Sequence, residues 1–310
     1  MRNEMKHTPQ SLLERAAEIY DFGAALRAPA AAPAAEPVPE PKPEPAPAAA
    51  PPPAPRALRA VEPPRPAAGV AGVAEVDRKG LTERGFIDLD APATGLAEEF
   101  RLIKHQLVAD VERTDSRAVL ICSAQPKAGK TFCAINLALS LAGERDIEVL
   151  LVDADFPKPE ALALLGIDGR GPGLVDALAD AGADPESFVI RTDVPGLSVL
   201  PAGRKANNVP ELLASDRTRE VLAKLVAGDR RRIILFDSPP ALMASHATVL
   251  AGHVGQALVV VRADQTTEAD LRETIGLLRG CGRIGLVLNG AGLAVTGRKF
   301  GAYDGYGHDQ

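Results

Sequence analysis

A run of eight residues, from Ala124 to Thr131, combines the residue types that bind phosphate. It reads A-Q-P-K-A-G-K-T, follows the apolar stretch 118–121 and opens a segment rich in alanine and leucine. Holding the phosphates of a nucleotide requires converging backbone N–H groups, a cation and a hydroxyl that can bind Mg²⁺. Here Gly129 lets the backbone approach closely, Lys130 reaches the outer phosphates, and Thr131 offers its oxygen to Mg²⁺. The pattern predicts a phosphate-binding loop, and a Gly-Lys turn without a ligand is the alternative.

The elements that must position this loop are apolar runs that alternate with helical stretches. Strands are predicted at 118–121, 149–152, 197–200, 233–236, 257–261 and 284–288. Helices are predicted at 132–142, 173–179, 209–226, 246–251 and 267–279. Short runs that are apolar on both faces and separated by helices indicate an α/β fold, with a mostly parallel sheet covered by helices on both faces.

Two of the predicted strands run directly into aspartates. Asp153 and Asp155 follow the run 149–152, and Asp237 follows the run 233–236. Ligands of such sheets bind at the carboxyl ends of the strands, so we expect these carboxylates beside the phosphate loop. A single aspartate at a strand end can simply cap a turn. Three that converge on a phosphate loop are expected to organise Mg²⁺ and the attacking group.

The composition changes sharply along the chain. More than half of the 27 prolines lie between Pro29 and Pro66, in an Ala/Pro/Glu tract that cannot bury a core. We predict an amphipathic helix within residues 1–28, a disordered linker at 29–79, a P-loop domain at 80–296 and a flexible Gly/Tyr tail at 297–310. The first helix is marked by the capping box S-L-L-E at 11–14, and either a docking peptide or a frayed extension fits it.

Charge and hydropathy exclude several classes of function. A net charge of −6 and a pI near 5.5 argue against nucleic-acid binding as the main task. The apolar stretches are too short to span a bilayer, and the N-terminus lacks the apolar core of a signal peptide. Cys122 and Cys133 are expected to be small buried residues in a reducing compartment. We expect a cytoplasmic protein that only a partner would hold at the membrane.

The succession of motifs resembles the kinase domain of bacterial tyrosine kinases, the BY-kinases, from roughly Leu96 to the C-terminus. The matching segments are S-A-Q-P-K-A-G-K-T (123–131), V-L-L-V-D-A-D (149–155), L-S-V-L-P-A-G (197–203), E-L-L-A-S (211–215) and I-I-L-F-D-S-P-P (233–240). In that family the three functional motifs are called Walker A, Walker A′ and Walker B. The Pro-rich leader and the tail are most similar to the subgroup encoded with exopolysaccharide and exosortase systems. The resemblance implies a P-loop tyrosine autokinase of exopolysaccharide biosynthesis that uses ATP and Mg²⁺.

The resemblance also implies roles for the matching residues. Lys130, Asp153 and Asp155 would be catalytic, with Asp153 accepting or positioning the tyrosyl proton. Thr131, Asp155 and Asp237 would hold Mg²⁺ or its waters. A phenol with a pKa of about 10 is a poor nucleophile at neutral pH, so a neighbouring carboxylate has a clear use. Whether Asp153 is a proton acceptor or a metal ligand stays open.

The nucleotide contacts follow from the same loop. They are predicted at Gln125, Pro126, Lys127, Ala128, Gly129, Lys130, Thr131 and Phe132. Asn289 follows the last predicted strand, and in related ATPases such an asparagine contacts adenine, although it can also satisfy a turn. The loop departs from the family pattern, because Lys127 and Ala128 replace a glycine-acid pair. Pro157 and Lys158 stand where two arginines often follow the Walker A′ aspartates.

A charged helix and the tail suggest how subunits would meet. Glu98, Arg101 and Lys104 share one face of a predicted helix. They resemble the E-x-x-R-x-x-R helix that forms the subunit contact of BY-kinase rings, and an ordinary solvated face is the alternative. The tail carries Tyr303 and Tyr306, which we expect to be autophosphorylated by a neighbouring subunit. An inner-membrane polysaccharide co-polymerase or activator is the other expected partner.

Two other functions remain open. A ParA/MinD-like ATPase switch shares the fold, but such ATPases commonly carry a second lysine where this chain has Gln125. A non-catalytic nucleotide-binding adaptor of a polysaccharide co-polymerase is compatible with the altered loop residues and the sparse tyrosines.

Overall fold

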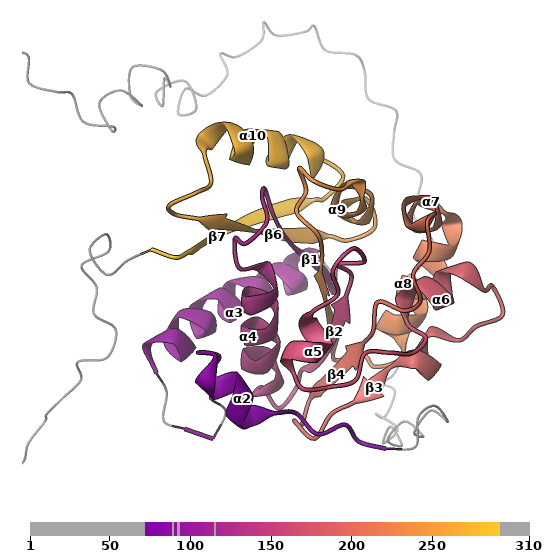
Figure 1. Cartoon of the computed structure of the whole chain (residues 1–310), viewed down its shortest axis with the longest axis horizontal. Helices are drawn as coiled ribbons and strands as arrows, with labels where there is room; N and C mark the ends of the chain where they lie inside the picture. Colours follow the sequence, from indigo (N-terminus) through magenta and orange to yellow (C-terminus); the bar gives the residue numbers. More distant parts are fainter. Residues whose placement is uncertain (1–71, 89, 92–93, 115, 292–310) are drawn as a thin grey trace, which may run out of the picture. The chain divides into compact units, whose positions relative to one another are not determined.

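The computed structural model describes residues 72–88, 90–91, 94–114 and 116–291. In this part of the chain, seven strands form one sheet in the order β3-β4-β2-β5-β1-β6-β7 (Figure 1). All neighbouring strands are parallel except the short β3, which is antiparallel to β4. The strands are β1 (Ala118–Ser123), β2 (Glu148–Asp153), β3 (Ile190–Arg191), β4 (Leu197–Leu200), β5 (Arg232–Asp237), β6 (Gln256–Arg262) and β7 (Arg283–Asn289). The predicted P-loop NTPase class and its mostly parallel sheet are confirmed.

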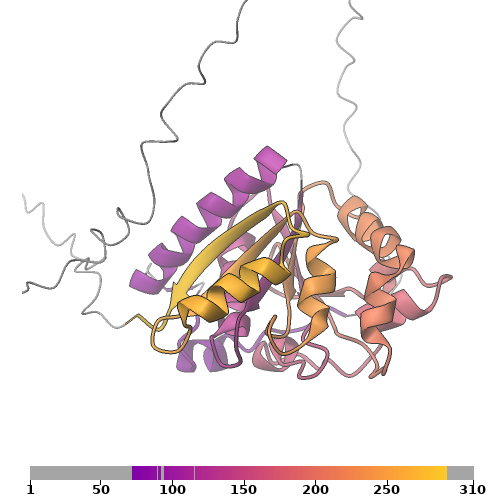
Figure 2. The same cartoon turned by 90° about the horizontal axis from the view of Figure 1, so that it is seen from above.

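Helices cover both faces of the sheet. One face packs against α2 (Arg78–Glu83), α3 (Gly95–Thr114), α4 (Lys130–Ala142) and α5 (Ala161–Leu164). The other packs against α6 (Leu174–Ala179), α7 (Val209–Ala214), α8 (Asp216–Ala227), α9 (Ser245–Ala251) and α10 (Glu268–Leu277), with a 3₁₀ turn, η2, at Pro185–Phe188. Alternate strand residues enter the two cores, as the pleat requires: Ile121 faces the first and Cys122 the second. Figure 2 shows the last strands lying between α3 and α10.

The helix α4 is the centre of the first layer. Its sequence, K-T-F-C-A-I-N-L-A-L-S-L-A, carries no charge after Lys130, and nine of its residues are buried. A helix that is apolar nearly all round is stable only inside a core. α4 packs against β1, β2 and β5, so its first turn is fixed directly after the carboxyl end of β1.

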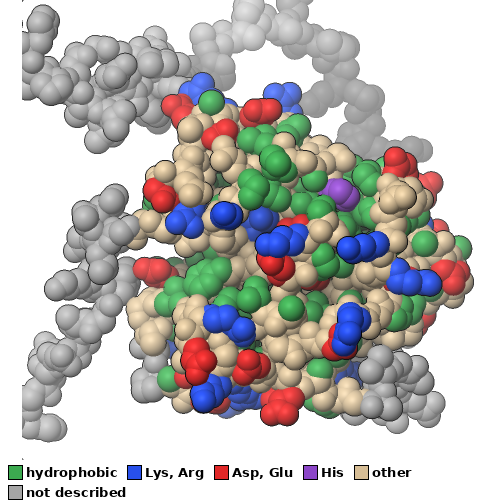
Figure 3. Space-filling model, viewed as in Figure 1, with side chains coloured by type: hydrophobic (Ala, Val, Ile, Leu, Met, Phe, Trp, Pro, Cys, Tyr) green, Lys and Arg blue, Asp and Glu red, His purple; other side chains and the backbone are tan. Residues whose placement is uncertain are grey.

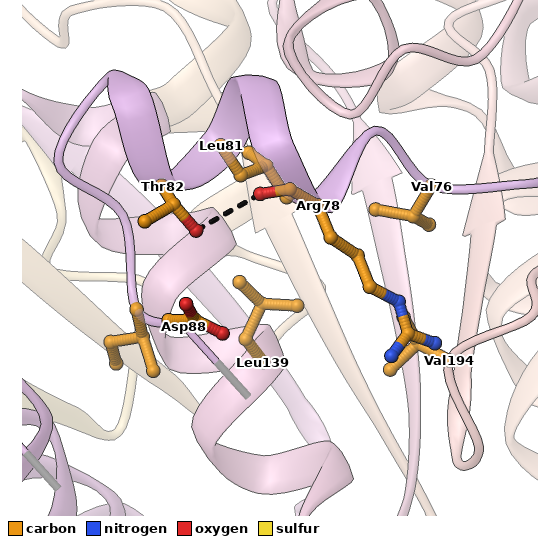
Figure 4. Close-up of a pocket in the computed structure, with 8 residues that line it drawn as sticks. Val76, Arg78, Leu81, Thr82, Asp88, Leu139 and Val194 are labelled. Atoms are coloured by element: carbon orange, nitrogen blue, oxygen red, sulfur yellow. Dashed lines mark hydrogen bonds between the residues drawn. The ribbon is translucent and has the colours of Figure 1, made fainter. Parts of the chain in front are cut away.

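The folded domain begins earlier than the predicted start at Gly80. Ala74 forms a parallel bridge with Thr192, and the N–H of Val76 donates to Asp193 Oδ1 at 2.8 Å. Figure 4 shows α2 lying over α4, where a small cavity of about 10 Å³ is lined by both helices and by Val76, Ile87, Asp88 and Val194. Residues 72–79, assigned above to the linker, therefore belong to the domain. The prolines of the tract stop at Pro66, and residues 67–79 are rich in alanine, glycine and valine, so no sharp change in composition marks the boundary.

A buried asparagine fastens this N-terminal arm to α4. The N–H of Ile87 donates to Asn136 Oδ1 at 2.8 Å, and Asn136 Nδ2 donates to the carbonyl of Phe132 at 2.9 Å. The rings of Phe86 and Phe132 pack beside this pair, with centroids 5.0 Å apart. The arm is thus held by both polar and aromatic contacts.

Three further features differ from the sequence-based expectations or extend them. The predicted helix 209–226 is two helices, because Ser215 has an extended backbone (ψ 160°) between α7 and α8. The strand β3 was missed because only two residues pair with β4. Among the described residues, no helix combines the length and apolarity that a membrane crossing requires. The predicted helix within residues 1–28 and the tail 297–310 lie outside the described residues.

We expect Asn136→Ala to lower the free energy of unfolding by about 1–3 kcal/mol, because the buried N–H of Ile87 would lose its acceptor. Urea denaturation measures this loss. Glu99→Ala, an exposed change on α3, is the matched control and should stay within about 0.5 kcal/mol of wild type. Equal stability of Asn136→Ala and wild type would contradict the anchoring role.

Candidate active site

The carboxylates predicted to converge come from neighbouring strands. Asp153 ends β2 and Asp237 ends β5, and the two residues are direct partners in the parallel register. Neighbouring strands lie about 4.8 Å apart, so the two side chains emerge next to each other. β1 is the other neighbour of β5, with Ile121 opposite Asp237, and it leads into the phosphate-binding loop. The sheet therefore brings both aspartates and the loop to one edge.

The backbone of the loop is held by its carbonyl groups. Asn289 Nδ2 donates to the carbonyl of Ala128 at 2.9 Å, and a guanidinium nitrogen of Arg262 donates to that of Lys127 at 3.2 Å. Within the described residues, no hydrogen bond uses the N–H groups of Lys127, Ala128 or Gly129. Fixed carbonyls and free N–H groups are what an anion-binding loop needs.

Two residues of the loop have left-handed backbones. Gly129 has a φ of 96°, and a Cβ placed on it would lie 2.1 Å from Asn289 Nδ2. Glycine is therefore required there by both conformation and space. Lys127 has a φ of 63° without being glycine, which is a strained choice for this loop. The side chain of Lys130 is buried, with 7% exposure, at the first position of α4.

Asp237 is fully buried, and neither of its carboxylate oxygens has a hydrogen-bond partner among the described residues. Burial raises its pKa to about 8, while the nearby Thr131 hydroxyl opposes this rise. A buried carboxylate with two unused acceptors is costly unless a cation is close. This orphaned pair of oxygens fits Mg²⁺, which Thr131 and Asp155 would help to hold.

The described residues contain no group of three or more His, Cys, Asp or Glu side chains arranged around one metal position. Mg²⁺ is usually bound by one or two carboxylates together with waters and substrate phosphates. The donor set of Thr131, Asp155 and Asp237 is of this kind, so the remaining ligands would come from a nucleotide and from water.

Asp153 is bound differently from Asp237. One of its oxygens accepts from the N–H of Ala161 at 3.0 Å and the other from the N–H of Asp155 at 3.3 Å. Burial, at 2% exposure, raises its pKa to about 7, although these two N–H groups oppose the shift. Asp153 therefore fixes the segment that follows β2 and can still exchange a proton near neutral pH. The pKa of Asp155 is raised by burial, and Lys130 opposes that rise.

Several side chains predicted to contact a nucleotide point elsewhere. Gln125 Nε2 donates to Asp270 Oδ2 at 3.0 Å, beside the N-terminus of α10. The ring of Phe132 packs on Phe86 and Phe100, with centroids 5.0 and 6.3 Å away. For these two residues only the backbone remains available to a phosphate. Pro126 is exposed, and the side chain of Asn289 donates to the carbonyl of Ala128, so a contact of Asn289 with adenine stays a prediction.

The charged row on α3 is not uniformly exposed. Arg101 pairs with Glu98 at the surface. Lys104 is buried, with 7% exposure, and bonds Glu144 just beyond the end of α4. We expected all three side chains to contact a second subunit. This expectation is wrong for Lys104, whose side chain is buried within its own subunit. Tyr303 and Tyr306 lie outside the described residues.

Two polar groups that shape this edge were not predicted from the sequence. Arg262 ends β6 and bonds the loop carbonyl of Lys127. The feature of the sequence that could have identified it is a charged residue directly after the apolar run 257–261. Asp176 is buried and accepts from the N–H groups of Gly173 and Arg204 and from the Arg204 guanidinium. It fixes the turn after β4, and nothing in the local sequence distinguishes it from a solvated aspartate.

No protein-family model matches the chain, but individual proteins and solved structures are similar to it. The chain is similar to the putative tyrosine-protein kinase EpsB of Ralstonia nicotianae, with 34% identity over 184 residues, and to the tyrosine-protein kinase etk of Escherichia coli K12, with 31% identity over 208 residues. These matches cover 59% and 66% of this chain but 24% and 28% of the relatives. The chain thus spans about a quarter of the length of the curated relatives that it matches.

Two solved structures are similar over most of the described domain. The kinase domain of VpsO matches with a TM-score of 0.55 and 34% identity, over 63% of this chain and 93% of that one. The kinase domain of the Escherichia coli tyrosine kinase ETK matches with a TM-score of 0.61 and 29% identity, over 72% and 85% of the two chains.

The raised pKa values of Asp153 and Asp237 predict a pH-dependent stability in EDTA. Both carboxyls titrate above their usual value of 3.8, so folding takes up protons, and the free energy of unfolding falls as pH rises from about 4 to 8. A loss of ~1 kcal/mol lowers the Tm by about 2–4 °C in a domain of this size. Excess Mg²⁺ should reduce the fall, because a bound cation replaces the protons.

Thermal denaturation between pH 5.5 and 8, with EDTA or with Mg²⁺, measures this effect. Asp237→Asn should flatten the pH profile and remove most of the Mg²⁺ effect. A profile of unchanged slope in that variant would show that Asp237 is not the group responsible.

We expect Asn289→Ala to weaken the binding of ATP and of inorganic tripolyphosphate alike, by about 2–10-fold, because the loop loses one hydrogen bond. Isothermal titration measures both affinities, and Asn207→Ala, an exposed change, is the control. A loss confined to ATP would instead assign Asn289 to the adenine.

Proposed function

Because the chain belongs to the bacterial tyrosine kinase family, we propose that it is an ATP-dependent protein-tyrosine kinase that phosphorylates its own C-terminal tyrosines. The observation that carries the proposal is the edge of the sheet where β1, β2 and β5 end. A phosphate-binding loop, a carboxyl with a near-neutral pKa and an unpartnered buried carboxylate meet there. Phosphoryl transfer needs little more than this positioning and charge.

The nucleotide is proposed to be ATP, bound through its phosphates at the loop 125–131. The free N–H groups of Lys127, Ala128 and Gly129 support this assignment, as does the buried ammonium of Lys130. Mg²⁺ would neutralise charge on the phosphates, held by Thr131, Asp155 and Asp237. The orphaned oxygens of Asp237 support its place in this set.

The transfer step is proposed to use Asp153 as the proton acceptor. The tyrosyl oxygen forms a bond to the terminal phosphorus while the bond to ADP breaks, and the phenolic proton passes to the carboxylate. A general base is most effective when its pKa lies near the working pH, and the pKa of Asp153 is about 7. Its two backbone hydrogen bonds would keep the carboxylate in place during the transfer.

The acceptors are proposed to be Tyr303 and Tyr306 of a neighbouring subunit in a ring. Glu98 and Arg101 form an exposed pair on α3 that can take part in the subunit contact. Lys104 would not touch the neighbouring subunit. It would hold α3 in place for that contact, since it bonds Glu144 beyond the end of α4. Exposed ion pairs contribute only about 0–1 kcal/mol each, but a ring repeats the contact at every interface.

The cellular role is proposed to be control of exopolysaccharide polymerisation or export, in the cytoplasm and at the inner membrane through a co-polymerase or activator. The support is the likeness of the leader and tail to the exosortase-associated subgroup. No interaction with nucleic acid is proposed, in keeping with the net charge of −6.

One observation favours a second candidate, a non-catalytic nucleotide-binding adaptor. Lys127 occupies a left-handed position of the loop at a φ of 63°, where the family usually has glycine. The ATPase-switch alternative gains no such support, because Gln125 bonds Asp270 and carries no charge.

We expect Lys130→Met to abolish autophosphorylation, by at least about a hundredfold, because the loop loses its cation at the outer phosphates. The purified protein is incubated with ATP and Mg²⁺, and phosphotyrosine is mapped by mass spectrometry. Lys205→Met, an exposed lysine in the loop before α7, is the matched control. Wild-type protein that binds ATP but forms no phosphotyrosine would favour the adaptor.

The same assay tests transfer between subunits. A Tyr303→Phe, Tyr306→Phe protein keeps its loop but lacks acceptors, and Lys130→Met keeps its acceptors but lacks the loop cation. Mixing the two should place phosphate on the tail of Lys130→Met. An unmodified tail in the mixture would contradict transfer in trans.

A further inference from the structure

The geometry points to Phe156 and His246 as an aromatic wall that receives the tyrosyl ring of the acceptor. This inference rests on the proposed kinase function and names the surface that would recognise the phenol. The two rings pack against each other, with centroids 5.5 Å apart and planes tilted by 40°.

The pair lies at the same edge as the loop and the aspartates. Phe156 follows Asp155 directly after β2, and His246 is the second residue of α9, which follows the connection from β5. Phe156 is the immediate chain neighbour of Asp155, so the ring pair stands next to one of the carboxylates of the site.

Each ring is only partly buried. Phe156 packs one side against the second core and keeps part of its surface at the solvent, as does His246. Met243, in the same connection, exposes 68% of its surface. Figure 3 shows a histidine surface bordered by hydrophobic side chains in the region of α9. An apolar surface beside the charged site can bury a phenol ring while its hydroxyl faces the carboxylates.

The histidine contributes its ring to the wall. Its Nδ1 is buried without a partner among the described residues, and its ring lies against that of Phe156. An imidazole packed on a phenylalanine extends the aromatic surface. Such a surface distinguishes tyrosine from serine or threonine, whose side chains are too short to cover it.

The adenine of the nucleotide is the other planar group that such a wall can hold. We assign the wall to the acceptor because it stands beside β2, whereas Asn289 and Arg262 hold the loop from β7 and β6, on the opposite side of β1. The two possible occupants differ in their effect on ADP affinity.

The test uses a full-length Tyr303→Phe, Tyr306→Phe parent and a synthetic peptide, K-F-G-A-Y-D-G-Y-G, as the acceptor. At saturating ATP, Phe156→Ala and His246→Ala should raise the KM for this peptide about tenfold, as loss of an aromatic contact predicts. ADP affinity, measured by titration, should not change. His246→Phe should retain the parental KM, because it keeps the ring.

Phe156→Leu, which keeps the apolar volume, serves if Phe156→Ala does not fold, and it should still raise the KM. Leu277→Ala, an exposed leucine of α10, is the control for general surface effects. An unchanged peptide KM in the Phe156 and His246 variants overturns the wall while leaving the kinase function intact. Equal losses of peptide and ADP binding assign the pair to the nucleotide and also overturn it. A parent that phosphorylates no peptide overturns the proposed function itself.

Discussion

The site depends on the burial of two carboxylates side by side at the centre of the sheet. Asp153 and Asp237 are register partners on adjacent parallel strands, and both are almost completely removed from water. Ionising one carboxyl in such a place raises the cost of ionising its neighbour, and each carboxylate needs a partner. Asp153 has two backbone N–H groups, whereas Asp237 has none among the described residues. The fold therefore leaves one strong demand for positive charge, directly beside Lys130.

The phosphate-binding loop can hold a ligand that brings this positive charge. Its carbonyl groups are bonded within the protein, whereas its N–H groups are left for the ligand. Its carbonyls are taken by Asn289 and Arg262, from the ends of β7 and β6. Its N–H groups point to no protein acceptor in the described residues. A ligand that is negatively charged and brings a cation satisfies both the N–H groups and Asp237, which explains why the loop and the aspartates occupy one edge.

The main features of this arrangement could be predicted from the sequence. Apolar runs that end in aspartate fix where the strands stop, and the carboxyl ends of parallel strands share one edge. The direction of individual side chains could not be predicted, because it depends on contacts distant in sequence. Phe132 turns to Phe86, Lys104 to Glu144 and Gln125 to Asp270, none of which a local pattern can reveal.

The ends of the helices and strands also depend on contacts that a local pattern does not show. The break at Ser215 and the two-residue strand β3 depend on one backbone conformation and one short pairing, which periodicity does not detect. The early start of the domain depends on Val76 reaching Asp193, more than a hundred residues later. Local patterns thus place the centres of the elements, and long-range contacts decide their ends.

The contacts that the sequence did not reveal join the loop to the proposed subunit surface. Phe132, at the third position of α4, packs on Phe100 of α3, and Lys104 of α3 bonds Glu144 just beyond the other end of α4. The helix that begins with the loop lysine is therefore attached to α3 at both of its ends. A ligand at the loop and a subunit contact at Glu98 and Arg101 would act on one packed unit, so neither helix can shift without disturbing the other.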